Sequence, residues 1–227
     1  MLLDDKRLEN SSVVVNSLMN RQRGCLGGNS YQKELSLNPI EFLMARLSQQ
    51  NEVCWLDLCC GSGKALIQAS HFFHAEALAS NVQLIGIDLV AMFDSYPAEF
   101  SFLQLQQATV NQWQPSTRFD LITCVHGLHY VGDKLRLLQN ACSWLKQDGI
   151  FLTHIDLQNL RSESGGAVGK QIIRELKRVG VEYHSKKKLI ICKGHREFDL
   201  KFDYIGADDK AGPNYTGQAA VNSYYRL

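Results

Sequence analysis

Hydrophobic residues gather in short runs that contain almost no polar positions. These runs lie at 53–58, 82–87, 119–125 and 150–155, and residues 100–105 alternate between apolar and polar types. An unbroken apolar run predicts a strand that is buried on both faces of a sheet, and alternation predicts a half-buried strand. The first two thirds of the chain therefore predict five strands of one buried sheet.

Between these runs the apolar residues recur every three or four positions, which predicts amphipathic helices. The helical segments are 64–79, 134–146 and 169–179, and a short helix is predicted to begin at Met92–Phe93. A further helix is predicted to start at Pro39, because Asn38 is a favourable cap and proline suits the first turn. Alternation of strands and helices predicts an α/β fold: a doubly wound, mostly parallel seven-stranded sheet with helices on both faces.

The last third of the chain has a different pattern after its helix. Strand-like stretches follow one another at 181–184, 189–193 and 197–205, and Lys193-Gly194-His195 reads as the hairpin turn between the last two. This predicts a C-terminal antiparallel strand pair. Residues 206–227 are rich in tyrosine as well as glycine and asparagine, so we expect this tail to pack back on the domain.

The N-terminal part shows little periodicity beyond a short helix around Val13–Met19. A polar, glycine-containing loop follows at 20–29. We therefore divide the chain into an extension of helix and loop over 1–38, a candidate lid, and a single domain over 39–227.

One stretch carries the clearest chemical signal, because a buried strand, a glycine turn and a helix start follow each other within 53–66. Gly61 and Gly63 form the turn, and Asp57 is the one acid of the strand. Such a turn brings backbone N–H groups and the positive end of a helix dipole to one point, which suits a nucleotide-like ligand. A dinucleotide site would place a third glycine where Leu66 stands, so the match to G-x-G-x-x-G is weak.

Five segments, spread over residues 53–156, resemble the motifs of class I S-adenosylmethionine-dependent methyltransferases. They are Leu56–Gly63, Ile85–Asp88, Gln106–Ala108, Phe119–Cys124 and Leu145–Phe151. Two departures are visible: Cys59 stands where the first glycine of the turn is usual, and Gln107 stands where aspartate is commoner. The resemblance implies the cofactor S-adenosyl-L-methionine, a ribose held by Asp88 and an adenine bordered by Gln107.

By this resemblance the cofactor contacts come from the glycine turn, from the ends of the next three strands and from the N-terminal loop. The implied residues are Tyr31, Asp57, Cys59, Gly61, Ser62, Gly63, Asp88, Leu89, Gln107, Ala108, Val125 and His126.

Methyl transfer from a sulfonium mainly requires that the acceptor be positioned and water excluded. A general base is needed only when the acceptor must lose a proton, and histidine has a suitable pKa. The candidates are His126, His154 and His129, which lie at or after the ends of the fourth and fifth strands. Each could equally serve as a packing or orienting residue. Asp156 could orient His154 or could simply cap the next turn.

Composition narrows the class of partner. The formal net charge is +1, so no global field attracts nucleic acid or an anionic membrane. The longest apolar runs are too short to cross a bilayer, and acids follow the first methionine closely. Seven cysteines without a C-x-x-C pair indicate buried thiols in a reducing compartment, so we expect a cytoplasmic protein.

The chemical alternatives remain open at this point. No N-P-P-Y or D-P-P-Y follows the fourth strand, and no cluster of Asp and Asn ligands is visible near the fourth and fifth strand ends. We expect metal-independent O- or N-methylation of a small molecule or short peptide and no nucleic-acid substrate. A non-catalytic binding or interaction protein of the same fold is the alternative, and a nicotinamide-dependent oxidoreductase is a distant third.

Overall fold

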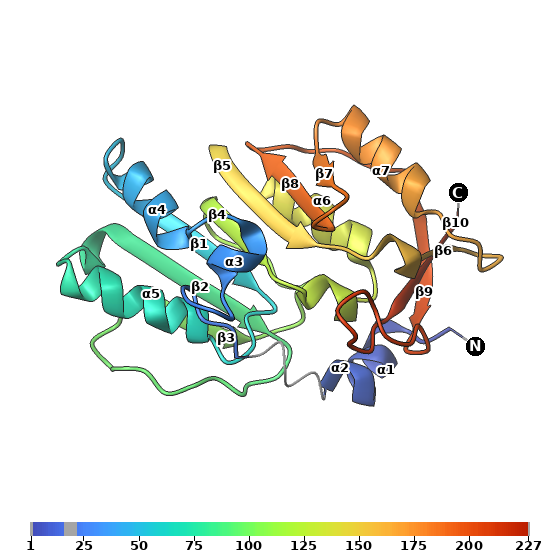
Figure 1. Ribbon diagram of the computed structural model, residues 1–227, viewed down its shortest axis with the longest axis horizontal. Coiled ribbons are helices and arrows are strands. Elements are labelled where there is room, and N and C mark those ends of the chain that lie inside the picture. The colour runs from blue at the N-terminus through green and yellow to red at the C-terminus, as the bar shows by residue number, and fades with distance from the viewer. Residues whose placement is uncertain (1, 16–21, 227) are drawn as a thin grey trace.

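The computed structural model describes residues 2–15 and 22–226, and a seven-stranded sheet forms its centre (Figure 1). Its strands in chain order are β1 (Val53–Leu58), β2 (Val82–Asp88), β3 (Leu103–Gln107), β4 (Phe119–Cys124), β5 (Leu145–His154), β7 (Glu182–His184) and β8 (Leu189–Lys193). They lie in the order β3-β2-β1-β4-β5-β8-β7. The first five are parallel, and β8 is antiparallel to both β5 and β7. The predicted mostly parallel sheet with an antiparallel pair is confirmed.

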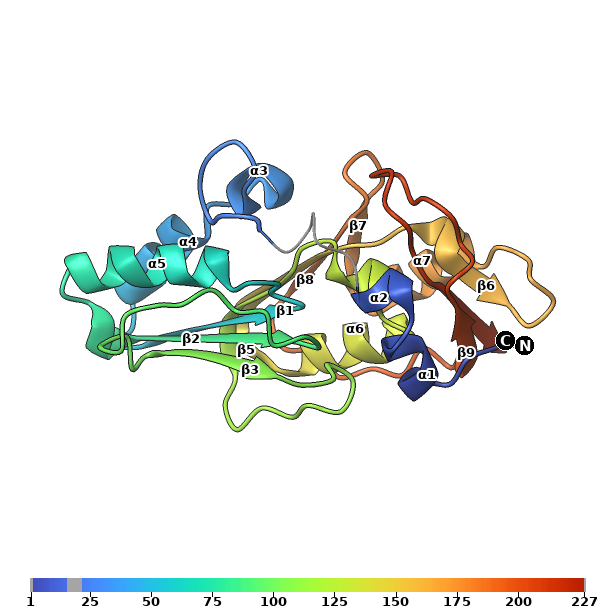
Figure 2. The same ribbon diagram turned by 90° about the horizontal axis from the view of Figure 1, so that it is seen from below.

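Helices cover both faces of this sheet, as the apolar runs predicted. One face packs against α3 (Tyr31–Leu35), α4 (Pro39–Leu47) and α5 (Lys64–Ala75), through side chains such as Trp55, Leu84 and Leu121 (Figure 2). The other face packs against α6 (Lys134–Ser143) and α7 (Gly169–Arg178), through the alternate residues of the same strands. Because both faces are covered, β1 and β4 are buried at every position.

Local sequence sets the helix boundaries. Asn38 Oδ1 accepts hydrogen bonds from the backbone N–H groups of Ile40 and Glu41, and Pro39 is the first residue of α4, so the predicted cap is confirmed. The predicted short helix at Met92–Phe93 is wrong. Asp94 N donates instead to Ser62 O, and Ser62 Oγ donates to Asp94 Oδ2. This segment is thus tied to the glycine turn without forming a helix of its own.

The predicted hairpin turn at 193–195 is also wrong. Gly194 N and His195 N donate to Gly149 O and Lys146 O, so the chain continues past the start of β5 and does not turn back on β8. Residues 194–202 form no strand, and the chain enters a second sheet of order β6-β10-β9. That sheet consists of β6 (Leu160–Ser162), β9 (Asp203–Asp208) and β10 (Asn222–Arg226).

The tail packs back on the domain, as expected from its tyrosines. Tyr225 in β10 is fully buried, and Val221 N donates to His129 O. Lys134, at the start of α6, donates from Nζ to Val131 O, Val221 O and Ser223 Oγ. Burial lowers the pKa of Lys134 to about 7. In the described part of the chain, 3-10 turns lie at Ala79–Asn81, Gly127–Tyr130 and Leu157–Asn159.

The N-terminal extension lies in two places. The short helices α1 (Asp5–Glu9) and α2 (Ser12–Val15) lie beside β9 of the second sheet, where Leu3 forms a β-bridge with Ala207. In contrast, α3 lies over the central seven-stranded sheet (Figures 1 and 2). The helix predicted over Val13–Met19 is described as far as Val15, and its remainder lies outside the described residues. Within the described ranges, no helix is both long and apolar enough to cross a membrane.

Asp120 is the buried acid that joins β1, β4 and β5. Its carboxylate accepts hydrogen bonds from Cys54 N, Gln50 Nε2 and Lys146 Nζ at 2.6 to 2.8 Å. We expect Asp120→Asn to lower the free energy of unfolding by about 2 kcal/mol, because hydrogen bonds to a buried charge are among the strongest. Urea denaturation checks this value. The control is Asp199→Asn, an exposed surface pair with Lys201 that should change stability by less than about 0.5 kcal/mol; equal effects would contradict the prediction.

Candidate cofactor and acceptor site

The glycine turn lies between β1 and α5, beside the carboxyl ends of β2 and β4. Cys59, Gly61 and Gly63 all have positive φ, at 56°, 62° and 77°. Cys59 therefore occupies a left-handed position, which explains why glycine is usual there. Gly61 N donates to Asp88 Oδ2 over 2.8 Å, so the acid at the end of β2 holds the turn closed.

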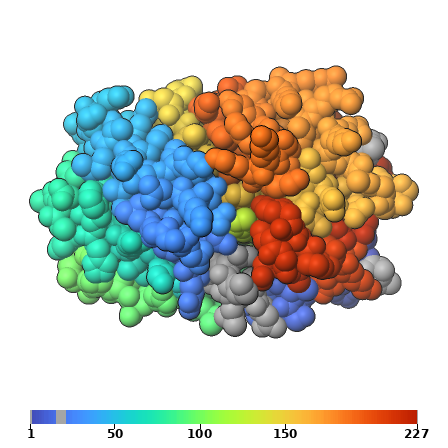
Figure 3. All heavy atoms as spheres, viewed as in Figure 1, coloured from blue at the N-terminus to red at the C-terminus, as the bar shows by residue number. Residues whose placement is uncertain are grey.

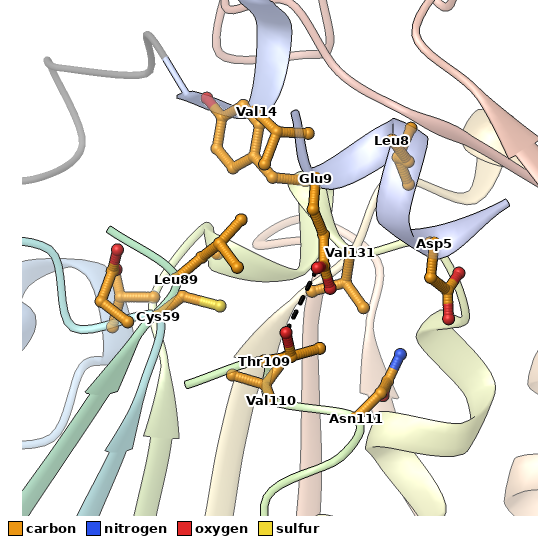
Figure 4. Close-up of a pocket in the computed structure, with 15 residues that line it drawn as sticks. Asp5, Leu8, Glu9, Val14, Cys59, Leu89, Thr109, Val110, Asn111 and Val131 are labelled. Atoms are coloured by element: carbon orange, nitrogen blue, oxygen red, sulfur yellow. Dashed lines mark hydrogen bonds between the residues drawn. The ribbon is translucent and has the colours of Figure 1, made fainter. Parts of the chain in front are cut away.

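A pocket of about 80 Å³ opens beside this turn (Figure 4). Cys59, Asp88, Leu89 and Val125 line it, as the motifs implied. Further lining residues come from the segment after β3, from the turn after β4 and from the two N-terminal helices. These are Thr109, Val110, Asn111, Gly127, Tyr130, Val131, Gly132, Asp5, Leu8, Glu9 and Val14.

The chemistry of this pocket fits the cofactor that the motifs imply. Asp88, at the end of β2, has carboxylate oxygens that can accept hydrogen bonds from ribose hydroxyl groups. Leu89, Val110 and Val131 give apolar walls for a planar base. Asn111 lies in the wall with 9% of its surface exposed, and its Oδ1 has no hydrogen-bond partner among the described residues. An unpartnered buried acceptor is costly unless a ligand supplies a donor.

Several implied cofactor residues lie outside the lining of this pocket. Gln107 is exposed and donates from Nε2 to Leu89 O over 3.1 Å, while Ala108 N donates to Asp88 O. Ser62 is engaged with Asp94. The backbone of Gly63 starts α5 without a side-chain cap, so its turn still presents N–H groups.

Tyr31 and Asp57 contact each other inside the protein. The Tyr31 hydroxyl donates to Asp57 Oδ2 over 2.8 Å, and Thr123 Oγ1 donates to Asp57 Oδ1 over 2.6 Å. Burial raises the pKa of Asp57 to about 7, although both hydrogen bonds oppose the rise. The pair anchors α3 on β1 and β4.

The three candidate histidines lie in one cluster at the ends of β4 and β5. The rings of His126 and His154 stack with centroids 4.2 Å apart and an angle of 14° between their planes. The His129 ring centroid is 5.7 Å from that of His126. All three side chains are buried, with at most 2% of each residue exposed.

Two residues that the sequence did not single out as chemical groups complete this cluster. Glu34 in α3 lies 3.1 Å from His126 through Oε2, and its Oε1 accepts from Arg23 Nη1 over 2.7 Å. The hydroxyl of Tyr215, in the tail, is 3.4 Å from His126 Nδ1. Figure 3 shows the red tail beside the blue N-terminal region, with yellow-green atoms of the colour of the segment after β4 visible between them.

The electrostatics distinguish His126 from its neighbours. The hydrogen bond from His126 lowers the pKa of Glu34 to about 2, so Glu34 is a carboxylate at neutral pH. A carboxylate can only accept, which favours the tautomer with hydrogen on His126 Nε2 and a lone pair on Nδ1. Burial, with the nearby His126, lowers the pKa of His154 to about 3. Burial likewise lowers the pKa of His129, so both neighbours are weak bases.

Glu34, His126 and His154 are the group of potential metal ligands found among the described residues, with ligand atoms within 4.8 Å of one another. A metal ion binds an imidazole nitrogen along its lone pair, which lies in the plane of the ring. Because the two rings are stacked, their planes are nearly parallel and separated, and one ion cannot lie in both. The geometry therefore favours a hydrogen-bonded cluster over a metal centre.

Asp156 has the capping role that was one of its two expected roles. Its Oδ1 accepts from Gln158 N over 3.0 Å, and its Oδ2 accepts from Tyr215 N over 3.3 Å. It thus holds the tail loop that carries Tyr215 over His126.

These buried groups make stability depend on pH. Between pH 6.5 and about 3, His154 takes up a proton only when the protein is unfolded, so stability falls as pH falls; His129 acts in the same direction. Between about pH 7 and 3.8, Asp57 holds a proton only in the folded state, so it opposes this fall. Glu34 makes the stability depend on pH only below pH 4.5, where it takes up a proton in the unfolded protein first.

We therefore expect the free energy of unfolding to decrease from pH 7 to 5, and to decrease more steeply in Asp57→Asn, with each group contributing up to about 1.4 kcal/mol per pH unit. Urea denaturation over this range measures both slopes. A flat profile in both proteins would contradict the assignment.

Comparison with known proteins now adds the family. The methyltransferase-domain family matches residues 30–189, while comparison with curated proteins gives no match. The N-methyltransferase NodS from Bradyrhizobium japonicum, solved with S-adenosyl-l-homocysteine, is 16% identical with a TM-score of 0.42, over 80% of this chain and 98% of NodS. A SAM-dependent methyltransferase from Aquifex aeolicus is 15% identical with a TM-score of 0.44, over 72% of this chain and 91% of that one.

The CurJ carbon methyltransferase is 15% identical with a TM-score of 0.46, over 68% of this chain and 52% of that one. The chain also covers 42% of coclaurine N-methyltransferase and 36% of the DszA carbon methyltransferase, and thus about half or less of these longer proteins. The match to the methyltransferase-domain family spans most of the chain, from α3 to β8, and contains the glycine turn, Asp88 and the histidine cluster. The chain belongs to the methyltransferase-domain family.

Proposed function

We propose that this enzyme methylates an oxygen or nitrogen of a small molecule or short peptide, with His126 as the general base. The observation that supports this most strongly is the position of His126 between Val125 and Gly127. Both neighbours line the cofactor pocket, while the His126 ring faces Glu34 and Tyr215. A base at the boundary between the cofactor pocket and a second cluster is suitably placed for an acceptor that must lose a proton.

When bound, S-adenosylmethionine would supply an activated methyl group for transfer to the acceptor. Asp88 would hold its ribose, and the apolar walls of the pocket would exclude water. His126 Nδ1 accepts the proton of the acceptor once the Tyr215 hydroxyl no longer contacts it. Glu34 fixes the tautomer of His126 and stabilises the resulting imidazolium.

We also propose that the N-terminal extension and the tail regulate access. The pocket volume of about 80 Å³ is smaller than the roughly 300–1,000 Å³ typical of ligand sites, and α1 and α2 form one of its walls, so a small outward shift of these helices would widen the pocket. The part of the extension that carries α3 is held by the Tyr31–Asp57 hydrogen bond and stays in place. The tail loop around Tyr215 covers the acceptor side.

The test proceeds in two steps. Calorimetric titration with S-adenosylmethionine and S-adenosylhomocysteine should give binding of both, and NAD(P)H should give none, because Leu66 is fully buried where a dinucleotide site needs glycine. A panel of hydroxyl, amine, thiol and carbon acceptors is then incubated with S-adenosylmethionine, and methylated products are sought by mass spectrometry. Cofactor binding without methylation of any acceptor would favour the non-catalytic alternative, and transfer to carbon or sulfur alone would overturn the proposed acceptor atom.

A further inference from the structure

The residue that the family pattern implies for adenine recognition does not line the pocket in this structure. The exocyclic amine of adenine is a hydrogen-bond donor, so the pocket must supply an acceptor. The resemblance places that role at Gln107. In the structure Gln107 is exposed, bonded to Leu89 O, and outside the lining of the pocket. The acceptor must therefore come from elsewhere in the lining.

Glu9, the last residue of α1, is a first source. Its side chain extends into the pocket, and Oε2 accepts a hydrogen bond from Thr109 Oγ1 over 3.2 Å (Figure 4). A carboxylate has about four acceptor positions, and Thr109 fills one of them. Burial raises the pKa of Glu9, and the hydrogen bond from Thr109 opposes this rise.

Asn111, which follows β3 by a few residues, is a second source. Its Nδ2 donates to Asp133 O over 3.2 Å, and this contact fixes the orientation of the amide. Its Oδ1 is buried and has no partner among the described residues. Asn111 thus presents a buried acceptor that nothing in the described part of the protein satisfies, and it does so in the wall of the cofactor pocket.

We propose that Glu9 and Asn111 together accept the exocyclic amine of the cofactor's adenine, and that Gln107 does not. These contacts rest on the proposed cofactor and do not depend on the identity of the methyl acceptor. It also makes α1 part of the cofactor site. α1 is held to the second sheet by the Tyr204 hydroxyl, which donates to Asp5 Oδ1 over 3.1 Å. Cofactor binding should therefore stabilise the contact between α1 and the rest of the protein.

Titration calorimetry of the full chain tests the proposal without any acceptor, using S-adenosylhomocysteine and S-inosylhomocysteine. The second ligand carries a carbonyl oxygen in place of the amine. This oxygen can only accept hydrogen bonds, so it cannot bond to the acceptor oxygens of Glu9 and Asn111. We expect the wild-type protein to prefer the adenosyl ligand by about 10- to 100-fold. Glu9→Gln should reduce that preference at least fivefold, because glutamine can donate to the carbonyl. Asn111→Ala should reduce the affinity for the adenosyl ligand by about tenfold.

Gln107→Ala is the matched control and should leave the preference unchanged. Thermal unfolding of each variant establishes that the fold is retained. The proposal is overturned if Glu9→Gln keeps the wild-type preference, if Asn111→Ala keeps the wild-type affinity for the adenosyl ligand, or if Gln107→Ala loses the preference. Failure of the wild-type protein to bind either ligand would overturn the cofactor assignment itself, which is a distinguishable result.

Discussion

Replacing Asp88 by alanine is expected to weaken the binding of S-adenosylhomocysteine on the order of 10³-fold. Asp88 lines the cofactor pocket, and it also closes the glycine turn through Gly61 N and orders the next residues through Val90 N. In the proposed binding mode Asp88 accepts two charge-assisted hydrogen bonds from the ribose, each contributing about 1.5–3 kcal/mol, and the substitution removes them as well as loosening the turn. Titration calorimetry measures the change.

Asp94→Ala is the control for this experiment. Asp94 is bonded to the same turn through Ser62, but it does not line the pocket. We expect it to change affinity by less than about fivefold, because the lost hydrogen bond to Ser62 is one in which the ligand takes no part. Asp88→Ala binding as well as the control would show that the ribose is held elsewhere.

His126→Ala should reduce the rate of methyl transfer by about 10³-fold once an acceptor with a removable proton is found, because general-base catalysis contributes roughly 10²–10⁴-fold. Affinity for the cofactor should change little, since the His126 side chain lies outside the pocket lining.

Glu34→Gln should reduce the rate by about 10- to 100-fold and shift the pH profile, because the amide no longer stabilises an imidazolium.

His184→Ala provides the control, because this histidine is exposed on β7 and contacts Glu182. It should retain the wild-type rate. If His126→Ala also retains the wild-type rate on an acceptor that loses a proton, His126 is not the base. His154→Ala is then the next variant to test, although burial lowers the pKa of His154 and makes it a weak base.

The central sheet was predictable because its signals are local. Apolar runs long enough to be buried on both faces correspond to β1, β2, β4 and β5, and the Asn38–Pro39 cap defines the start of α4. The hairpin at 193–195 and the helix at Met92–Phe93 were wrong for a shared reason. In both places, backbone or side-chain hydrogen bonds to distant residues, such as Gly149 and Ser62, outweigh the local preference.

The positions of some pocket-lining residues and of the histidine cluster were also predictable. The glycine turn, Asp88, Leu89, Val125 and the gathering of three histidines follow from motifs whose spacing is fixed along the chain. Glu34 and Glu9 were not identifiable as site residues. Each lies many positions from the motif residues that it approaches and belongs to a segment with no motif of its own. Only Asn111, shortly after the third motif, could have been found by extending a motif.

The sequence by itself determined the type of sheet, the glycine turn and the methyltransferase family, because these depend on short-range patterns of burial and backbone conformation. The tertiary structure alone decided which histidine of the cluster hydrogen-bonds to a carboxylate, since Glu34 lies 3.1 Å from His126 and belongs to a helix 92 positions away in the chain. It also decided that α1 and the tail enclose the site. Such choices depend on the packing of distant segments and on the desolvation of the charges that they carry, and a linear pattern records neither.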